Sequence, residues 1–181
     1  MMPASDAWAL LDQAEMICSP EEIHGVLERL AKEITAGLGD QYPVVLSVMG
    51  GAVVFTGQLL PMLRFPLDFD YLHASRYGEN LAGKELCWKA LPKQDVKGRA
   101  VLVLDDILDE GYTLAAIRDK LLEMGAASFH CAVFSDKEIG REKPIRADYV
   151  GVRLPNRYVF GFGMDAKGAW RNLPAVYAMK D

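Results

Sequence analysis

The chain has 181 residues, of which 51% are hydrophobic and 25% charged, as expected for a single globular domain with a sizeable core. Its formal net charge of −5 argues against non-specific nucleic-acid binding, which needs a basic surface. No apolar run approaches membrane-spanning length, and no secretory-signal pattern opens the sequence. The odd number of widely spaced cysteines predicts reduced thiols, so we expect a cytoplasmic protein.

Strands and helices are predicted to alternate along the chain. Ser19 and Glu22 form a capping-box pattern around Pro20, and apolar residues then recur at helical spacing, which predicts a helix over about 20–36. The other predicted elements are helices near 52–63 and 114–124 and strands near 44–49, 67–73, 86–91, 101–104, 129–134, 149–152 and 158–162. This order predicts an α/β fold with a mainly parallel sheet flanked by helices, in one domain spanning 1–181.

The segment 101–114 is the most informative part of the sequence. Its apolar run Val101–Leu104 is typical of a buried strand, and a glycine, Gly111, precedes the next helical pattern. Four carboxylates lie between them: Asp105, Asp106, Asp109 and Glu110. Acids at the carboxyl end of a parallel strand indicate a ligand site, and a glycine turn into a helix N-terminus suits a phosphate. The segment is therefore predicted to bind hydroxyls and metal with its acids, and phosphate with its backbone.

Other classes of protein also use clustered aspartates. The Asp-Asp-x-x-Asp pattern of prenyl-diphosphate enzymes requires a helix, so that residues i and i+4 share a face. Here the preceding residues are β-branched and a glycine follows. A haloacid-dehalogenase-type phosphatase would need Asp-x-Asp after the strand, whereas residues 105–107 are Asp-Asp-Ile. A solvated acidic loop that caps the helix is a further alternative.

Residues 101–113 resemble the phosphoribosyl-diphosphate signature of type I phosphoribosyltransferases, except that Glu110 stands where Thr or Ser is usual. Further segments, in the same order, resemble hypoxanthine-guanine members of that family over about residues 43–174: 48–51, 74–78, 135–137, 157–161, 164–165 and Arg171. The resemblance implies the family's core sheet with a small hood, formed by the N-terminal helices and the segment after about residue 150.

The resemblance also implies a purine-salvage reaction. The 5-phosphoribosyl group of phosphoribosyl diphosphate would pass to N9 of hypoxanthine or guanine, giving IMP or GMP and pyrophosphate. Asp109 would act as general base and acid facing purine N7. Asp105 and Asp106 would accept hydrogen bonds from the ribose hydroxyls. Tyr77, in a flexible loop that closes over the site, would contact the phosphoribosyl diphosphate.

By the same resemblance, two turns and a metal would bind the phosphates. The loop before the helix would hold the 5-phosphate: Glu110, Gly111, Tyr112 and Thr113. The first active-site loop and a distant arginine would bind pyrophosphate: Met49, Gly50, Gly51 and Arg171. Mg²⁺ would bridge the pyrophosphate and be held by carboxylates: Asp165, Asp105 and Asp106.

Base choice would depend on Lys137. An ammonium only donates hydrogen bonds, so it suits the 6-oxo group of hypoxanthine or guanine and disfavours adenine, whose 6-amino group also donates. Tyr158 would stack on the purine, and Val159 would offer its backbone groups to the purine edge. Xanthine differs from guanine at the 2-position, so a xanthine-preferring sister enzyme is an alternative.

Three positions depart from the family pattern or bear on it. Met49 replaces a usual Lys, and the resemblance allows a cis peptide bond between Val48 and Met49. Glu110 would place a carboxylate beside the 5-phosphate, a repulsive arrangement unless its side chain turns outward or reaches Mg²⁺, or unless another cation compensates it. Arg76, which replaces a usual Ser, is our hypothesis for that cation.

The expected partners are small molecules, with neither nucleic acid nor membrane among them. A regulatory protein that binds phosphoribosyl diphosphate without catalysis is the alternative from another class. Such proteins need a basic face or a helix-turn-helix, and the acidic chain shows neither. Relatives imply a homodimer or homotetramer.

Overall fold

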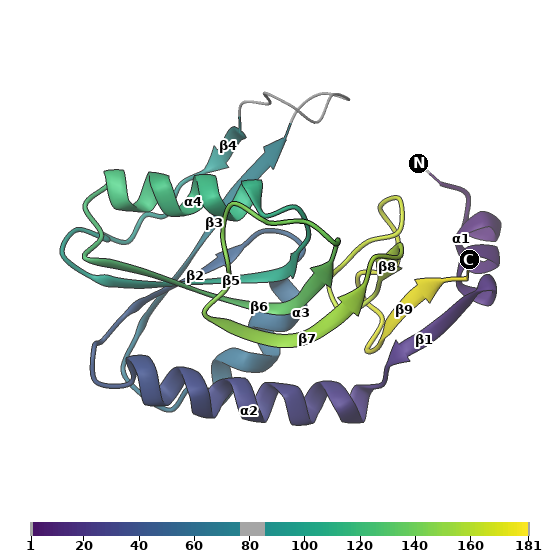
Figure 1. Cartoon of the computed structure of the whole chain (residues 1–181), viewed down its shortest axis with the longest axis horizontal. Coiled ribbons are helices and arrows are strands. Elements are labelled where there is room, and N and C mark those ends of the chain that lie inside the picture. Colours follow the sequence, from purple (N-terminus) through teal and green to yellow (C-terminus); the bar gives the residue numbers. More distant parts are fainter. Residues whose placement is uncertain (1, 77–85, 181) are drawn as a thin grey trace.

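The computed structural model describes residues 2–76 and 86–180. Its large sheet has six strands in the order β4-β3-β2-β5-β6-β7 (Figure 1). These strands are β2 (Val44–Val48), β3 (Asp68–Arg76), β4 (Leu86–Ala90), β5 (Ala100–Leu108), β6 (Ser128–Glu138) and β7 (Tyr149–Pro155). β3 and β4 pair antiparallel, and the other neighbours pair parallel. The predicted mainly parallel α/β sheet is confirmed.

Helices cover both faces of the large sheet (Figure 1). One face packs against α2 (Pro20–Leu38) and α3 (Val53–Leu59), which continues into the short 3-10 helix η1 (Leu60–Met62). The other face packs against α4 (Tyr112–Glu123). Because side chains alternate along a strand, the central strands β2 and β5 contribute to both cores: Val45 and Leu102 face α2, and Val44 and Val101 face α4.

The predicted capping box at the start of α2 is confirmed. Ser19 Oγ accepts a hydrogen bond from Glu22 N at 3.2 Å, and Glu22 Oε2 accepts one from Ser19 N at 2.7 Å. These bonds satisfy amides at the helix start that have no acceptor within the helix. The apolar stripe predicted from helical spacing is buried, including Ile23 and Leu27.

A second, three-stranded antiparallel sheet lies at one end of the molecule (Figure 1). It consists of β1 (Ala14–Cys18), β9 (Val176–Met179) and β8 (Val159–Phe160). The helix α1 (Ala4–Gln13) lies beside it, where Trp170 Nε1 donates a hydrogen bond to the carbonyl of Ala7 at 2.8 Å. α1 therefore lies against the small sheet, whereas α2 packs on the large sheet. The predicted division of the chain into a core and a hood stays a prediction.

Two central strands run further than the sequence pattern predicts. β5 continues from the apolar run through the aspartates to Leu108, and β6 continues to Glu138. The pairing of Ile107 with Ser135 and of Leu108 with Asp136 extends the ladder, and Leu108 is buried. Asp105 and Asp106 are consequently held on a strand, which fixes their direction better than a loop would, whereas Asp109 and Glu110 follow the end of β5. No helix within residues 2–76 and 86–180 is long and apolar enough to cross a membrane.

Candidate active site at the carboxyl ends of β2 and β5

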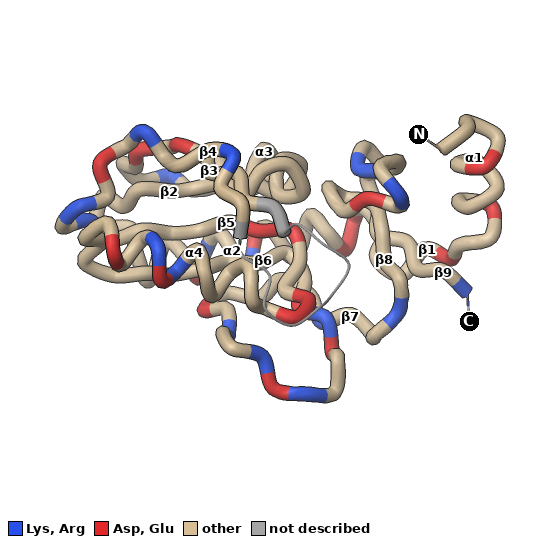
Figure 2. Tube along the Cα trace, turned by 90° about the horizontal axis from the view of Figure 1, so that it is seen from above, with Lys and Arg blue, Asp and Glu red and all other residues tan. Residues whose placement is uncertain are grey.

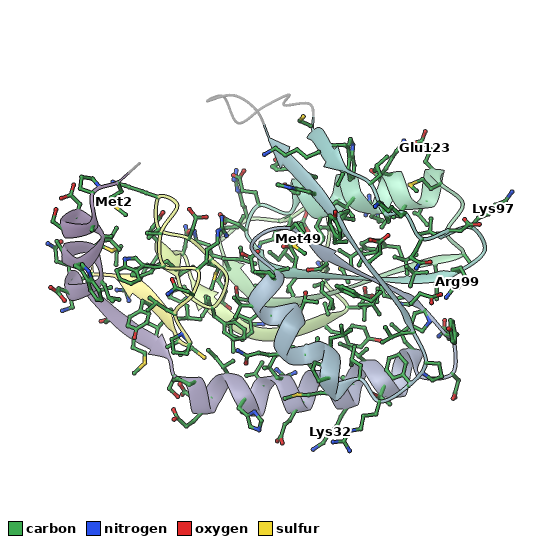
Figure 3. The ribbon with its side chains drawn as sticks, turned by 180° about the vertical axis from the view of Figure 1, so that it is seen from behind. Met2, Lys32, Met49, Lys97, Arg99 and Glu123 are labelled. Carbon is green, nitrogen blue, oxygen red and sulfur yellow. The ribbon has the colours of Figure 1, made fainter. Side chains whose placement is uncertain are left out.

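A cavity of about 480 Å³ opens at the carboxyl ends of β2 and β5. Figure 2 shows acidic segments in red close to the label of β5, and Figure 3 shows Met49 in the middle of the molecule. Most of the predicted site residues line this cavity: Met49, Gly50, Gly51, Asp105, Asp106, Asp109, Glu110, Gly111, Tyr112, Thr113, Asp165 and Arg171. Residues distant in sequence therefore meet at one site, as the family resemblance implied. Tyr77 lies outside the described residues.

Asp105, which is buried, and Asp106, which is partly buried, form an acid pair in the cavity. Asp105 Oδ1 accepts a hydrogen bond from Asp106 N at 3.0 Å, and Asp106 Oδ1 accepts one from Ile107 N at 3.0 Å. Burial, followed by the neighbouring charge of Asp106, raises the pKa of Asp105 well above its usual range. Burial also raises the pKa of Asp106, although the nearby Arg171 opposes that shift. Full ionisation of the pair is therefore costly without a compensating cation or donors.

The loop after β2 packs directly on this acid pair. A Cβ atom at Gly51 would lie 2.0 Å from Asp106 Oδ2, and one at Gly163 would lie 2.0 Å from the carbonyl oxygen of Gly51. Such distances are far below van der Waals contact, so both positions require glycine. Gly51 is thus clamped between the ribose-binding carboxylate expected at Asp106 and the turn at Gly163.

The cis peptide in this loop is Met49–Gly50, so the expected Val48–Met49 position is wrong by one residue. Met49 N still donates a hydrogen bond to the carbonyl of Leu72 at 2.8 Å, directly after the pairing of Val48 with Leu72. The Val48–Met49 peptide therefore continues the parallel ladder between β2 and β3. The chain leaves the ladder one residue later.

The turn from β5 into α4 has the form expected for an anion site. Gly111 has φ +84° and precedes the first helical residue, Tyr112. This left-handed conformation favours glycine. The first N–H groups of a helix have no acceptor within the helix and point outward from its N-terminus. The backbone at Gly111, Tyr112 and Thr113 is therefore oriented toward the cavity as phosphate binding requires.

Lys137 and Asp109 meet across the ends of β5 and β6. The Lys137 Nζ lies 3.7 Å from Asp109 Oδ1, and the lysine side chain is 16% exposed. The parallel register pairs Leu108 with Asp136 and so brings the two following residues side by side. Lys137 does not line the 480 Å³ cavity but a neighbouring cavity of about 720 Å³, and Leu108 lines both cavities. The proposed base-recognition lysine and general base thus share one corner of the site.

Glu110 pairs with Arg141, a residue that the sequence reasoning did not single out. Arg141 belongs to the 139–148 loop, which joins β6 to β7. Its guanidinium lies beside the Glu110 carboxylate, for which the sequence analysis expected a compensating cation. The earlier hypothesis gave this role to Arg76, whose side chain lies outside the described set. A charge-rich loop was the only sequence signal for Arg141.

The residues expected at the purine and pyrophosphate interact with one another. Tyr158, directly before β8, donates a hydrogen bond from its hydroxyl to the carbonyl of Asp165 at 3.4 Å and accepts one from Lys167 N at 3.3 Å. Arg171 forms an ion pair with the Asp165 carboxylate and donates to the carbonyl of Gly163 at 2.6 Å. Val159 begins β8 and is buried. These contacts hold the expected stacking residue beside the expected pyrophosphate arginine.

The acids of the cavity do not form a closed metal cage. Within residues 2–76 and 86–180, no group of three or more His, Cys, Asp or Glu side chains is placed to hold a metal ion. Mg²⁺ commonly binds through one or two carboxylates together with substrate phosphates and water. The donor set here, the two aspartates of the acid pair and the more distant Asp165, fits a metal that arrives with a polyphosphate.

Known proteins resemble this chain over nearly its full length. A family model for the phosphoribosyl transferase domain matches residues 14–167. The hypoxanthine-guanine phosphoribosyltransferase of Streptococcus pneumoniae is 32% identical over 171 residues, covering 94% of this chain and 95% of that protein. The hypoxanthine-guanine-xanthine phosphoribosyltransferase of Tritrichomonas foetus is 33% identical, covering 94% and 93%.

Solved structures agree with these sequence relatives. The structure of a hypoxanthine-guanine-xanthine phosphoribosyltransferase has a TM-score of 0.84 at 32% identity and covers 94% of this chain and 99% of its own. A hypoxanthine phosphoribosyltransferase from Trypanosoma cruzi has a TM-score of 0.86 at 29% identity, covering 93% and 97%. With the family match, the sheet order and the acid pair on β5, the chain belongs to the phosphoribosyl transferase domain family.

Proposed function

We propose that this chain is a purine-salvage enzyme that transfers the 5-phosphoribosyl group from phosphoribosyl diphosphate to N9 of hypoxanthine or guanine. The observation that carries the proposal is the 3.7 Å approach of Lys137 Nζ to Asp109 Oδ1 beside the acid pair of β5. A donor for the purine 6-oxo group and a carboxylate for the purine proton then lie at one corner. The relatives named above carry the same activity in their names.

Each part of the cavity has a role in this reaction. The bond from C1 of ribose to the pyrophosphate oxygen breaks as the bond from C1 to N9 forms, through a state with positive charge on the sugar. Asp105 and Asp106 accept hydrogen bonds from the ribose hydroxyls, and their charge favours that state. Asp109 takes the proton that the purine loses. Tyr77 stays the predicted contact from the loop outside the described residues.

Phosphates are held at two turns. The 5-phosphate binds at the N-terminus of α4, where Gly111 and Thr113 lie. The pyrophosphate binds between Gly51 and Arg171, and Arg171 exchanges its contact with Asp165 for one with the leaving group. Mg²⁺ bound with the polyphosphate supplies positive charge that this acidic chain lacks, with Asp165 and the pair on β5 as its protein donors.

The direct test is a panel of nucleobases mixed separately with the protein, Mg²⁺ and phosphoribosyl diphosphate. Pyrophosphate release with hypoxanthine and guanine, and little with adenine, is the expected result. Adenine should be poor because its 6-amino group faces the Lys137 ammonium, donor against donor. A greater rate with xanthine would favour the alternative of a xanthine-preferring enzyme. Release with none of the bases, together with binding of phosphoribosyl diphosphate, would favour a regulatory binding protein.

We also propose a cytoplasmic, homo-oligomeric enzyme. Cys18, Cys87 and Cys131 are free thiols, and burial raises the pKa of the Cys131 thiol to about 12, so that it stays protonated. Free thiols of this kind suit a reducing compartment.

The homodimer or homotetramer expected from the resemblance is tested by light scattering at several protein concentrations.

A further inference from the structure

Lys143 occupies an unusual position at the ends of β5 and β6. Its Nζ donates three hydrogen bonds: to the carbonyl of Leu108 at 2.7 Å, to the carbonyl of Lys137 at 2.7 Å and to Asp136 Oδ1 at 2.5 Å. An ammonium group has three protons, so this one is fully used. Lys143 itself belongs to neither strand but to the 139–148 loop.

The lysine is buried at this junction. Its side chain is 11% exposed, and the Asp136 carboxylate that neutralises it is 24% exposed. A buried charge is tolerated where it is paired and hydrogen-bonded. Charge-assisted hydrogen bonds of this length are among the stronger ones in proteins, so the ammonium is a firm link between the three groups.

The link joins the two backbone segments that carry the base-recognition corner. Leu108 is the residue before Asp109, and the second carbonyl belongs to Lys137 itself. The parallel pairing of β5 with β6 extends only as far as Leu108 and Asp136. Lys143 thus ties the strands together where the ladder ends, directly behind the pair formed by Asp109 and Lys137.

We propose that Lys143 is a positioning residue that sets the distance between Asp109 and Lys137, and with it the recognition of the purine. The proposal rests on the proposed function. It deepens that function by assigning base binding to a residue that itself lies behind the substrate cavity. The acid pair and the turn at Gly111 have anchors of their own. Ser135 Oγ donates a hydrogen bond to the carbonyl of Asp106 at 3.0 Å, and Ala115 N donates one to the carbonyl of Gly111 at 2.9 Å. We therefore expect binding of phosphoribosyl diphosphate to depend less on the Lys143 link.

Lys143→Met is the variant that tests the link. Methionine keeps most of the apolar stem, whose Cβ lies 3.4 Å from the position that a Cβ on Gly111 would take, and it removes all three donors. We expect the Michaelis constant for hypoxanthine and guanine to rise about 10- to 100-fold, the scale of effect of misplaced catalytic groups. The constant for phosphoribosyl diphosphate should change less than about twofold, and Lys143→Arg should recover part of the loss because it restores charged donors.

The matched control is Lys120→Met. Lys120 pairs with Glu123 at 2.9 Å on α4, away from the base corner, and its loss should leave both Michaelis constants unchanged. Thermal unfolding identifies folded variants. If Lys143→Met is not folded, Asp136→Asn tests the proposal in its place, because it keeps an acceptor for Lys143 but removes the negative charge. We then expect a smaller rise in the Michaelis constant for the base and no change for phosphoribosyl diphosphate.

Several results overturn the proposal. One is an unchanged Michaelis constant for hypoxanthine and guanine in folded Lys143→Met. If Lys143→Met does not fold, an unchanged constant in Asp136→Asn has the same meaning. Another is an equal rise for both substrates, which would mean a general loss of structure. Failure of the proposed function is distinguishable, because the unaltered protein would then release no pyrophosphate with hypoxanthine or guanine.

Discussion

The two ends of the candidate site are built in different ways. The end assigned to the ribose and the 5-phosphate consists of one continuous segment, residues 105–113, held by the β5 strand and the start of α4. The base end is assembled from β6, the 139–148 loop and residues 158–159, and ion pairs join Lys137 to Asp109 and Lys143 to Asp136. The residues of a continuous segment are placed together by the chain itself. The residues of the base end are brought together only by contacts between segments that are distant in the sequence.

The largest effect is expected at Asp109, which lies where the two ends meet, and it should fall on the chemical step and not on binding. Asp109→Ala removes the proposed general base, which should lower kcat by about 10²- to 10⁴-fold. Binding of the product nucleotide should change little because the ribose and phosphate contacts are intact. Steady-state rates and fluorescence titration measure the two quantities. Full activity in this variant would refute the proposed mechanism, and exposed Asp119→Ala on α4 is the control.

A backbone clash should damage the ribose end next. Gly51→Ala places a methyl group 2.0 Å from Asp106 Oδ2, so either the loop after β2 or the acid pair must move. We expect about 1–3 kcal/mol lower stability, as for other overpacked sites, and a rise in the Michaelis constant for phosphoribosyl diphosphate. Gly57→Ala is the control, because a methyl group there meets nothing within 4 Å. Equal behaviour of the two variants would show that the loop yields without cost.

A smaller effect concerns Glu110. Arg141→Met removes the positive charge that is paired with Glu110, so the carboxylate should repel the 5-phosphate more strongly and raise the Michaelis constant for phosphoribosyl diphosphate by a few fold. The ion pair is partly exposed, which limits its strength. The double variant Glu110→Thr with Arg141→Met should return close to the unaltered value. A double variant as weak as Arg141→Met would show that repulsion by Glu110 is not the cause.

The predictability of the molecule from its sequence follows the same division. The acidic motif, the glycine turn and the helix after it are neighbours in the chain, so periodicity and residue type suffice to place them. Lys143 and Arg141 gave no such signal, because their importance arises from contacts across 35 and 31 positions. The short strands β1 and β9 were also missed, since they pair with each other across the whole length of the chain.

The length of β5 was underestimated for a different physical reason. Polar residues after an apolar run usually mark the end of a strand, so the sequence pattern predicts a strand that ends at Leu104, before Asp105 and Asp106. Pairing with β6 continues past them, and the buried Leu108 completes the strand. Function has placed carboxylates where the local pattern favours apolar side chains, at a cost in stability.

That cost leads to the last prediction, which concerns stability and pH. Burial and the charge of Asp106 raise the pKa of Asp105 in the folded protein, whereas the unfolded chain has a pKa near ~3.9. Below that pH, Asp105 is protonated in both states and there is no penalty. As pH rises above it, the unfolded chain releases the proton first, so ionisation favours unfolding. Asp105→Asn removes this term at every pH.

The midpoint of thermal unfolding, Tm, should therefore rise in Asp105→Asn relative to the unaltered protein, and the difference should grow between about pH 4 and pH 8. Each kcal/mol corresponds to about 2–4 °C for a chain of this size. Exposed Asp119→Asn is the control and should give a small difference throughout. A gain in Tm that is the same at pH 4 and pH 8 would mean that ionisation of Asp105 does not destabilise the folded protein. The same substitution removes the expected ribose contact of Asp105, so activity should fall while stability rises. Such opposite effects are expected for a buried acid that lowers stability but is required for activity.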